Sequence, residues 1–451
     1  MRWRLRALTS APACWADAAM PADPILLMCA AFVVFAMLRF SIALMMFSCG
    51  LVYLWASRQD IGLIVDQTLN SSFQLNVLLA IPMFILAGNA MNAATISERI
   101  WAAADAAIGR LRAGLGHVTV LMNVVISSMS GSAVSDAAGA GMVAIQMMRK
   151  VGNYPGGLAV AITAASSCLG PIIPPSIPMV IYAILSGASV GALFLAGVVP
   201  GLLLAVSLML MVAWVGRRRG LPFGKATPLS EWPRVFGRAV IPFTLPVVLL
   251  GGIWGGIFTP TEAAAVAAFW AIVIGACIYR NLGPKALYAV FALSARQSTV
   301  VMMLIVSSFI VNFALEREGV AQGLAGWIAG LELSPLGFQL AVNVLFLLLG
   351  TVLDGAVMLL VFVPVLLPAA KSLGIDLVHF GVVVILNLMI AQVTPPYGLI
   401  LFVLSALTGV PMREINREIW QFCVPLAIVL LLLILFPAMT LGLPWLFGYK
   451  G

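Results

Sequence analysis

The sequence predicts an all-α polytopic membrane protein with about ten to twelve transmembrane segments. Hydrophobic residues make up 63% of its 451 residues and charged residues only 9%. The mean hydropathy of +1.11 lies far above that of soluble proteins. Long apolar stretches recur between short polar segments, and two sets of these stretches are related by a fixed spacing. A bundle of membrane-spanning helices built from two repeats satisfies all three observations.

The positive net charge predicts membrane topology rather than nucleic-acid binding. The formal net charge is +8, but the Lys and Arg residues lie mostly in short segments between apolar stretches. That distribution is typical of topology signals in membrane proteins. The six cysteines have no metal-like spacing and lie mostly in apolar segments, so we interpret them as packing residues.

A run of small and polar residues over 127–141 lies between two strongly apolar flanks, 117–126 and 142–148. Each flank is too short to span a bilayer. Irregular backbone at membrane depth survives only where protein covers it or where it lines a cavity. We therefore interpret 117–148 as a re-entrant helical hairpin with Ser130-Gly131-Ser132 at its tip. The alternative is a small-residue packing face on an ordinary spanning helix.

A second copy of this pattern lies 221 residues further along the chain. Ser130 precedes Pro174 by 44 residues, and Thr351 precedes Pro395 by the same number. Each copy contains an apolar arm, a polar tip, a second apolar arm, a basic turn and a long apolar helix interrupted at Pro-Pro. Interrupted hydrophobic segments in corresponding halves of a chain indicate the binding site of a secondary transporter.

The repeats divide the chain into two halves. Residues 20–216 form the first half, with the hairpin 117–148 and a broken helix 155–185, and residues 239–451 form the second, with a hairpin 338–370 and a broken helix 378–407. The basic segment 217–238 connects the halves as a cytoplasmic loop. Residues 1–19 are arginine-rich and only weakly apolar, and we interpret them as a non-native or mis-assigned N-terminal extension.

Hydropathy predicts the remaining elements. Residues 25–56 form one long kinked helix or a tight hairpin, and an amphipathic segment over 97–116 follows a span over 77–96. In the second half, a partly polar helix precedes a span over 299–315. The other predicted spans there are 239–258, 263–279 and 423–443.

Placing 217–238 in the cytoplasm puts most basic residues on that side. Of the assigned residues, only Arg58, Arg317, Lys371 and Lys450 then fall outside. The cytoplasmic set is Arg99, Arg110, Arg112, Arg149, Lys150, Arg217, Arg218, Arg219, Lys225, Arg234, Arg238, Arg280, Lys285, Arg296, Arg413 and Arg417. The first hairpin then enters from the inside and the second from the outside, so the two repeats are inverted.

Several motifs in this order resemble one family, the large membrane subunit of tripartite ATP-independent periplasmic (TRAP) transporters. The resemblance extends from about residue 25 to the end. Its motifs are Ser130-Gly131-Ser132 with Asp136, Ile173-Pro174-Pro175-Ser176, Gly256-Ile257-Phe258-Thr259-Pro260-Thr261-Glu262, Leu353-Asp354, His379-Phe380-Gly381 and Thr394-Pro395-Pro396-Tyr397-Gly398. The resemblance implies a sodium-driven, elevator-type importer of organic acids in the bacterial inner membrane. It also implies two partners, a small four-helix membrane subunit and a periplasmic substrate-binding protein.

On this interpretation the tips and the Pro-Pro breaks meet near the midplane and hold the coupling ion and the substrate, with no other cofactor. Hydroxyl, carboxylate and freed carbonyl oxygens are the ligands that a small hard cation prefers. The expected sodium ligands are Ser130, Gly131, Ser132, Asp136, Ile173, Gly350, Thr351, Asp354, Val393 and Thr394. The expected substrate path contains Pro174, Pro175, Ser176, Asn387, Gln392, Pro395, Pro396 and Gly398. Because no Lys or Arg lies in either tip, we expect helix N-termini and amides to meet the substrate carboxylate.

Two other classes of protein remain as alternatives. Asp136 and Asp354 could form the pair of an intramembrane aspartate-type hydrolase, although that function gives the repeats no role. An ion channel would also use re-entrant hairpins. The sequence does not select a particular organic acid.

Overall fold

The computed structural model describes residues 23–38, 40–60, 62, 76–224, 227–228, 230–330 and 332–450. The predicted N-terminal extension over 1–19 lies outside them. Regular structure within these ranges is helical, apart from one isolated antiparallel bridge between Arg112 and Phe223.

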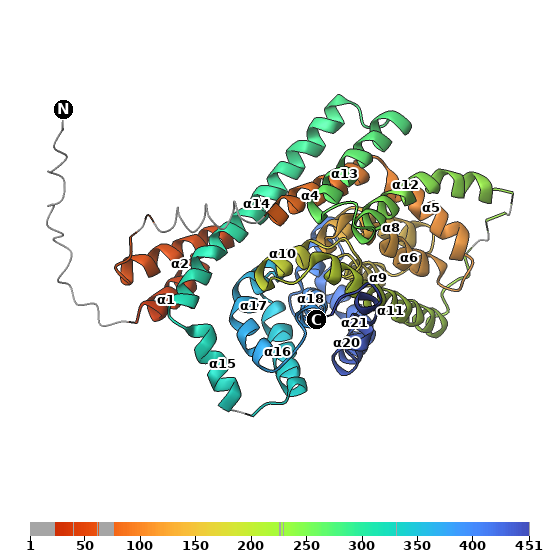
Figure 1. Ribbon diagram of the computed structural model, residues 1–451. Coiled ribbons are helices and arrows are strands. Elements are labelled where there is room, and N and C mark those ends of the chain that lie inside the picture. Colours follow the sequence, from red (N-terminus) through yellow and green to blue (C-terminus); the bar gives the residue numbers. More distant parts are fainter. Residues whose placement is uncertain are drawn as a thin grey trace, which may run out of the picture.

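One group of helices contains the long helix α14, helices that pack on it and helices that pack on these in turn (Figure 1). The group contains α1 (Pro24–Met37), α2 (Ile42–Ala56), the short 3₁₀ turn η1 (Asn76–Leu79), α4 (Ala80–Ala93), α5 (Ile96–Ile108), α12 (Trp232–Trp254), α13 (Pro260–Val273) with the π turn η2 (Ile274–Ile278), α14 (Pro284–Arg317) and α15 (Val320–Gly330). α2 and α4 both pack directly on α14.

The boundaries in this group settle two questions that the sequence left open or answered wrongly. α1 and α2 form a tight hairpin in which the two helices pack together, rather than one kinked helix. α14 is one continuous helix of 34 residues, where we predicted a polar helix followed by a separate span. Charged residues in the first part of α14 made the hydropathy fall there, but they do not interrupt its backbone.

The two predicted repeats appear as two matching sets of helices. The first set is α6 (Gly114–Ser130), α7 (Ala133–Ala138), α8 (Ala140–Lys150), α9 (Gly156–Ser167), α10 (Ile177–Ser186) and α11 (Val190–Arg218). The second is α16 (Pro335–Gly350), α17 (Gly355–Ser372), α18 (Leu377–Gln392), α19 (Leu399–Thr408) and α20 (Met412–Leu435), followed by α21 (Ala438–Leu446). Shifting the first set by 221 residues superimposes α6 on α16, α9 on α18, α10 on α19 and α11 on α20.

The two sets of helices interlock reciprocally. α10 packs against α17, and its counterpart α19 packs against α7. α9 packs against α20, and α18 packs against α11. At the centre, the thiol of Cys168 contacts the carbonyl of Met389 at 3.4 Å. These two residues are each other's counterparts, since 221 positions separate them.

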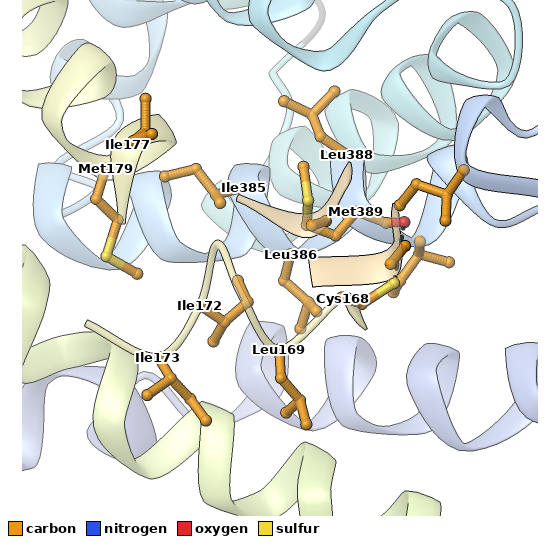
Figure 2. Close-up of a cluster of buried hydrophobic side chains, with 14 of the residues drawn as sticks. Cys168, Leu169, Ile172, Ile173, Ile177, Met179, Ile385, Leu386, Leu388 and Met389 are labelled. Carbon is orange, nitrogen blue, oxygen red and sulfur yellow. Dashed lines mark hydrogen bonds between the residues drawn. The ribbon is translucent and has the colours of Figure 1, made fainter. Parts of the chain in front are cut away.

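Apolar side chains fill the space around this central contact (Figure 2). Leu169 and Ile172 from the first break lie beside Leu386 and Met389 of α18. All four side chains are buried. The break after α9 is therefore held in the protein interior, where lipid does not reach its backbone.

Six helices within the described ranges are long and apolar enough to cross a membrane, and the pair formed by 77–93 and α5, bent by 68°, would make seven. The six are α11, α12, Pro260–Ile278, α14, α17 and α20. The other apolar helices are shorter and include α6, α16 and the halves of both broken helices. The protein is thus an all-helical, multi-span membrane protein, and the predicted ten to twelve segments depend on how these shorter helices cross.

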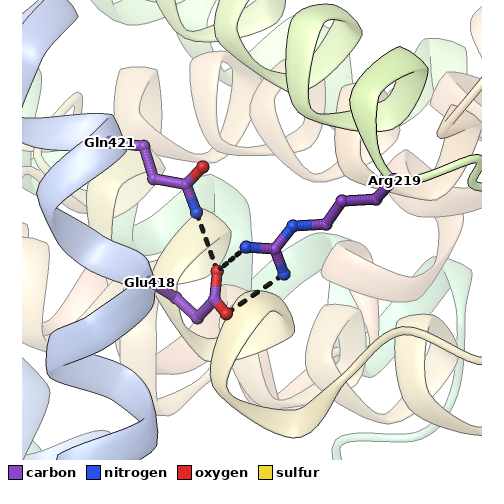
Figure 3. A network of polar contacts seen from close by, with 3 residues as sticks. All are labelled: Arg219, Glu418 and Gln421. Atoms are coloured by element: carbon purple, nitrogen blue, oxygen red, sulfur yellow. Dashed lines mark hydrogen bonds and ion pairs between the residues drawn. The ribbon is translucent and has the colours of Figure 1, made fainter.

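Polar contacts join three segments that carry predicted cytoplasmic residues. Arg219, just after α11, forms an ion pair with Glu418 of α20 at 2.6 Å, and Gln421 donates a further hydrogen bond to Glu418 (Figure 3). The backbone N–H of Ala113, before the first hairpin, donates to the carbonyl of Pro222 at 3.1 Å. The entry to the first hairpin, the end of α11 and the start of α20 are therefore adjacent.

A separate contact joins the C-terminal segment to the start of α18. Tyr449 donates a hydrogen bond to the Asp376 carboxylate at 3.2 Å. Lys371 and Lys450, both in the predicted outside set, lie five residues before Asp376 and one residue after Tyr449 in the sequence.

Candidate functional site

The first hairpin tip is built by a glycine and a serine that end one helix and start the next. α6 ends at Gly131, whose φ of +65° lies in the left-handed region that favours glycine. Ser132 then caps α7 by accepting a hydrogen bond from the Ser135 backbone N–H.

This tip lies directly against the first break. The carbonyl of Gly131 accepts a hydrogen bond from the Ile177 backbone N–H at 3.3 Å. A Cβ atom on Gly131 would lie only 2.7 Å from the carbonyl oxygen of Pro175. The sequence motifs of the first tip and the first break therefore form one structural unit.

Asp136 lies behind the tip and is fully buried. Its Oδ1 accepts a hydrogen bond from the Ser130 hydroxyl. Its Oδ2 has no hydrogen-bond partner among the described residues. A Cβ atom on Gly170 would lie 2.7 Å from that oxygen, so the glycine keeps space open beside it. A buried carboxylate oxygen without a partner is costly, and a bound cation would compensate it.

The other predicted residues of the first break are buried and engaged locally. Ser176 caps α10, accepting from the Met179 N–H at 3.2 Å, and donates to the Pro171 carbonyl at 2.6 Å. The side chain of Ile173 packs against Gly201 of α11. Pro174 and Pro175, joined by a cis peptide bond, are also buried.

The second tip uses a carboxylate as its helix cap. Asp354 Oδ1 accepts from the Ala356 N–H at 2.9 Å and caps α17. The Gln392 amide lies over the same turn, because a Cβ atom on Gly355 would lie 2.4 Å from its Nε2. Thr351 donates to the Leu348 carbonyl at 2.8 Å. Unlike its counterpart Ser130, Thr351 has no carboxylate partner, since position 357 holds valine where the first copy has Asp136.

The remaining predicted residues hold the second break in place. Thr394 donates to the Ile390 carbonyl at 2.7 Å, and Asn387 bridges α18 to α16 by donating to the Asn343 carbonyl at 2.8 Å. Gly398 starts α19 with a φ of +56°. Three further features complete the second break. Val393 is buried, Gly350 contacts α18, and a cis peptide bond joins Pro395 to Pro396.

Both tips open onto one cavity of about 510 Å³. Of the predicted site residues, five line it: Ser130, Gly131, Ser132, Asp354 and Gln392. The other thirteen are not among its lining residues: Asp136, Ile173, Pro174, Pro175, Ser176, Gly350, Thr351, Asn387, Val393, Thr394, Pro395, Pro396 and Gly398. The cavity thus lies between the two tips, and most of the predicted residues of the breaks are not part of its lining.

Helix N-termini face this cavity. Ile177 and Pro178, the first residues of α10, line it together with Gly355 and Ala356, the first residues of α17. The helix dipole makes such ends favourable for an anion, although the N–H groups of Ile177, Met179 and Ala356 already donate to Gly131, Ser176 and Asp354.

Sequence reasoning missed a third wall, which α4 and α14 form. Asn89, Arg296 and Gln297 line the cavity from these helices. Asn89 donates hydrogen bonds to Gln297 at 2.8 Å and to Ser294 at 3.0 Å, which joins α4 to α14. We predicted Arg296 on the cytoplasmic side, in a partly polar helix that precedes the span over 299–315, whereas it lies within the continuous helix α14. A single arginine inside an apolar helix was the available signal.

The fold places paired broken helices and hairpin tips around one cavity, within a bundle of membrane-length helices. This arrangement is typical of secondary transporters. The comparisons with known proteins identify the family. The family model described as "Tripartite ATP-independent periplasmic transporter, DctM component" matches residues 29–439. The chain therefore belongs to the TRAP transporter large permease family, and it is a multi-pass protein of the bacterial inner membrane and not an enzyme.

Curated relatives match most of the chain. It is 40% identical to the sialic acid TRAP transporter large permease SiaM of Vibrio cholerae, over 82% of this chain and 87% of the relative. It is 38% identical to the C4-dicarboxylate permease DctM of Pseudomonas aeruginosa, over 82% and 86%. It is 34% identical to the 2,3-diketo-L-gulonate permease YiaN of Escherichia coli, over 90% and 95%.

A solved structure shares the fold. The YdaH transporter of Alcanivorax borkumensis matches with a TM-score of 0.59 at 14% identity, covering 86% of this chain and 89% of that one. The family assignment excludes the aspartate-type hydrolase, which agrees with the use of Asp354 as a helix cap.

Proposed function

We propose that this chain is the sodium-coupled permease subunit of a TRAP transporter that imports an organic acid. A periplasmic binding protein would deliver the acid, and a small four-helix membrane subunit would complete the permease. The cavity between the two tips carries this proposal, because helix N-termini face it and its volume suits a small organic anion. The three relatives described above are named for sialic acid, C4-dicarboxylates and 2,3-diketo-L-gulonate, all of which are carboxylates.

Sodium as the co-transported ion fits the first tip best. Ser130 and Asp136 place a hydroxyl and a carboxylate together, and Asp136 Oδ2 has no partner among the described residues. The second tip offers the Thr351 hydroxyl and the Asp354 carboxylate, of which Oδ1 already caps a helix. We therefore propose two unequal cation sites, with the stronger at the first tip.

Alternating access would then move the hairpins and broken helices against the wall formed by α4 and α14. Such elevator motion, with inverted repeats, requires the first hairpin to enter from the cytoplasm and the second from the periplasm. The distribution of Lys and Arg residues along the sequence supports this arrangement.

Cysteine labelling should place the two ends on opposite sides of the membrane. In intact cells, a membrane-impermeant thiol reagent should label Lys450→Cys and should not label Arg217→Cys until the cells are opened. Periplasmic labelling of Arg217→Cys would contradict the topology and the inversion of the repeats.

Sodium-driven uptake by the reconstituted three-component system tests the function. Ser130→Ala and Thr351→Ala each remove one oxygen, so each should raise the sodium concentration needed for half-maximal uptake, Ser130→Ala by the larger factor. Ser207→Ala on α11 is the matched control, because its hydroxyl donates only to its own helix at Leu204. Unchanged sodium dependence in both tip variants would refute the site, and uptake without any sodium gradient would favour a channel.

A further inference from the structure

The cavity contains a cation that the hairpins and breaks do not supply. Arg296 lines it from α14. Among the lining residues, the only other charged one is Asp354. No ion pair joins the two, and the Arg296 guanidinium has no hydrogen-bond or ion-pair partner among the residues that the structure describes.

The surroundings of Arg296 leave its charge available. The neighbouring polar side chains form hydrogen bonds among themselves, since the Asn89 amide donates to the Gln297 amide oxygen and to the Ser294 hydroxyl. Asp354 turns Oδ1 toward the backbone of its own helix. Arg296 is exposed in this chain, and a charged residue within a helix of membrane-spanning length often marks the pathway of a substrate or an ion.

We propose that Arg296 is the fixed cationic anchor for a carboxylate group of the transported substrate. This inference rests on the proposed function, in which the substrate is an organic acid. The planar guanidinium presents two parallel N–H donors that match the two oxygens of a carboxylate. The N-terminus of α10 lines the same cavity, and its helix dipole favours a second polar group of the substrate there, whereas the start of α17 is capped by the Asp354 carboxylate.

The position of Arg296 also distinguishes this anchor from the helix ends. It belongs to α14, which packs on α2, α4 and α17, whereas the helix ends are those of α10 and α17. A substrate held by both Arg296 and the end of α10 would therefore bridge α14 to the first broken helix. Its affinity would then depend on how those helices are positioned relative to each other.

Substitution of Arg296 tests the anchor. We expect Arg296→Gln to raise the half-saturating concentration of sialic acid, succinate or 2,3-diketo-L-gulonate, whichever the wild-type system takes up, by about ten-fold or more. Arg296→Lys keeps the charge and should restore part of the loss. The sodium dependence should stay unchanged in both variants. Arg317→Gln removes the same charge from the exposed end of α14, outside the cavity, and should behave like the wild type.

Direct binding separates this inference from the proposed function. The purified permease is titrated in detergent with each acid and with succinamide, the uncharged analogue of succinate. The anchor predicts that the wild type prefers the acid and that Arg296→Gln loses this preference. Equal binding by the two proteins, including equal absence of binding, overturns the anchor. Failure of sodium-driven uptake in the wild type alone overturns the proposed function instead.

Discussion

Gly131→Ala should abolish uptake while the protein still inserts into the membrane. The left-handed conformation at Gly131 costs a residue with a Cβ atom about 1–2 kcal/mol. The new Cβ would also lie 2.7 Å from the Pro175 carbonyl, which is backbone and cannot move aside alone. The first tip must therefore separate from the first break and lose its hydrogen bond to Ile177.

Gly409→Ala separates the effect of backbone strain from the effect of the clash with Pro175. Gly409 ends α19 with a φ of +69°, close to that of Gly131, but a Cβ atom there would meet no atom within 4 Å. It should therefore lower the melting temperature of the protein in detergent and leave uptake measurable. Equal uptake by the two variants would show that contact between the tip and the break is unnecessary for transport.

Asp136→Asn should have the second large effect. Asparagine keeps the shape and can still accept a hydrogen bond from Ser130, but it removes the negative charge. If Asp136 Oδ2 binds sodium, losing a charged ligand should raise the half-maximal sodium concentration by about ten- to hundred-fold. Sodium titration of uptake, with surface expression measured in parallel, gives the factor.

Asp354→Asn provides the internal comparison. Asparagine caps helices as well as aspartate does, so the turn that begins α17 should survive. The sodium dependence should shift in the same direction but by a smaller factor, because Asp354 is partly engaged by its own helix. A larger shift for Asp354→Asn than for Asp136→Asn would reverse the assignment of the stronger site.

The fold was largely predictable because it repeats. The spacing that links Ser130 to Thr351 and Pro174 to Pro395 located both hairpins and both breaks within a few residues of their observed positions. The helices around α14 have no such internal copy. There, hydropathy alone assigned Arg296 to a polar segment, because an average over neighbouring residues cannot show that one charged side chain faces a cavity.

Roles within the site were harder to predict than its location. Asp136 and Asp354 both look like carboxylates at a polar tip. The structure buries Asp136 with one oxygen lacking a described partner, whereas it uses Asp354 as a helix cap. The two aspartates occupy different positions, since Asp136 lies inside α7 whereas Asp354 is the N-cap of α17. The first tip turns at a left-handed glycine and the second at Thr351 in a helical conformation.

The contact between Cys168 and Met389 has a thermodynamic consequence. A residue can touch its own counterpart only near a rotation axis that exchanges the two halves of the chain. Around such an axis each contact has a counterpart, and both members are present together here: α10 packs against α17 while α19 packs against α7. Under the proposed alternating access, in which the two halves exchange roles, the inward-open and outward-open states would contain nearly the same contacts and differ little in free energy. A modest ion gradient would then be sufficient to drive the cycle.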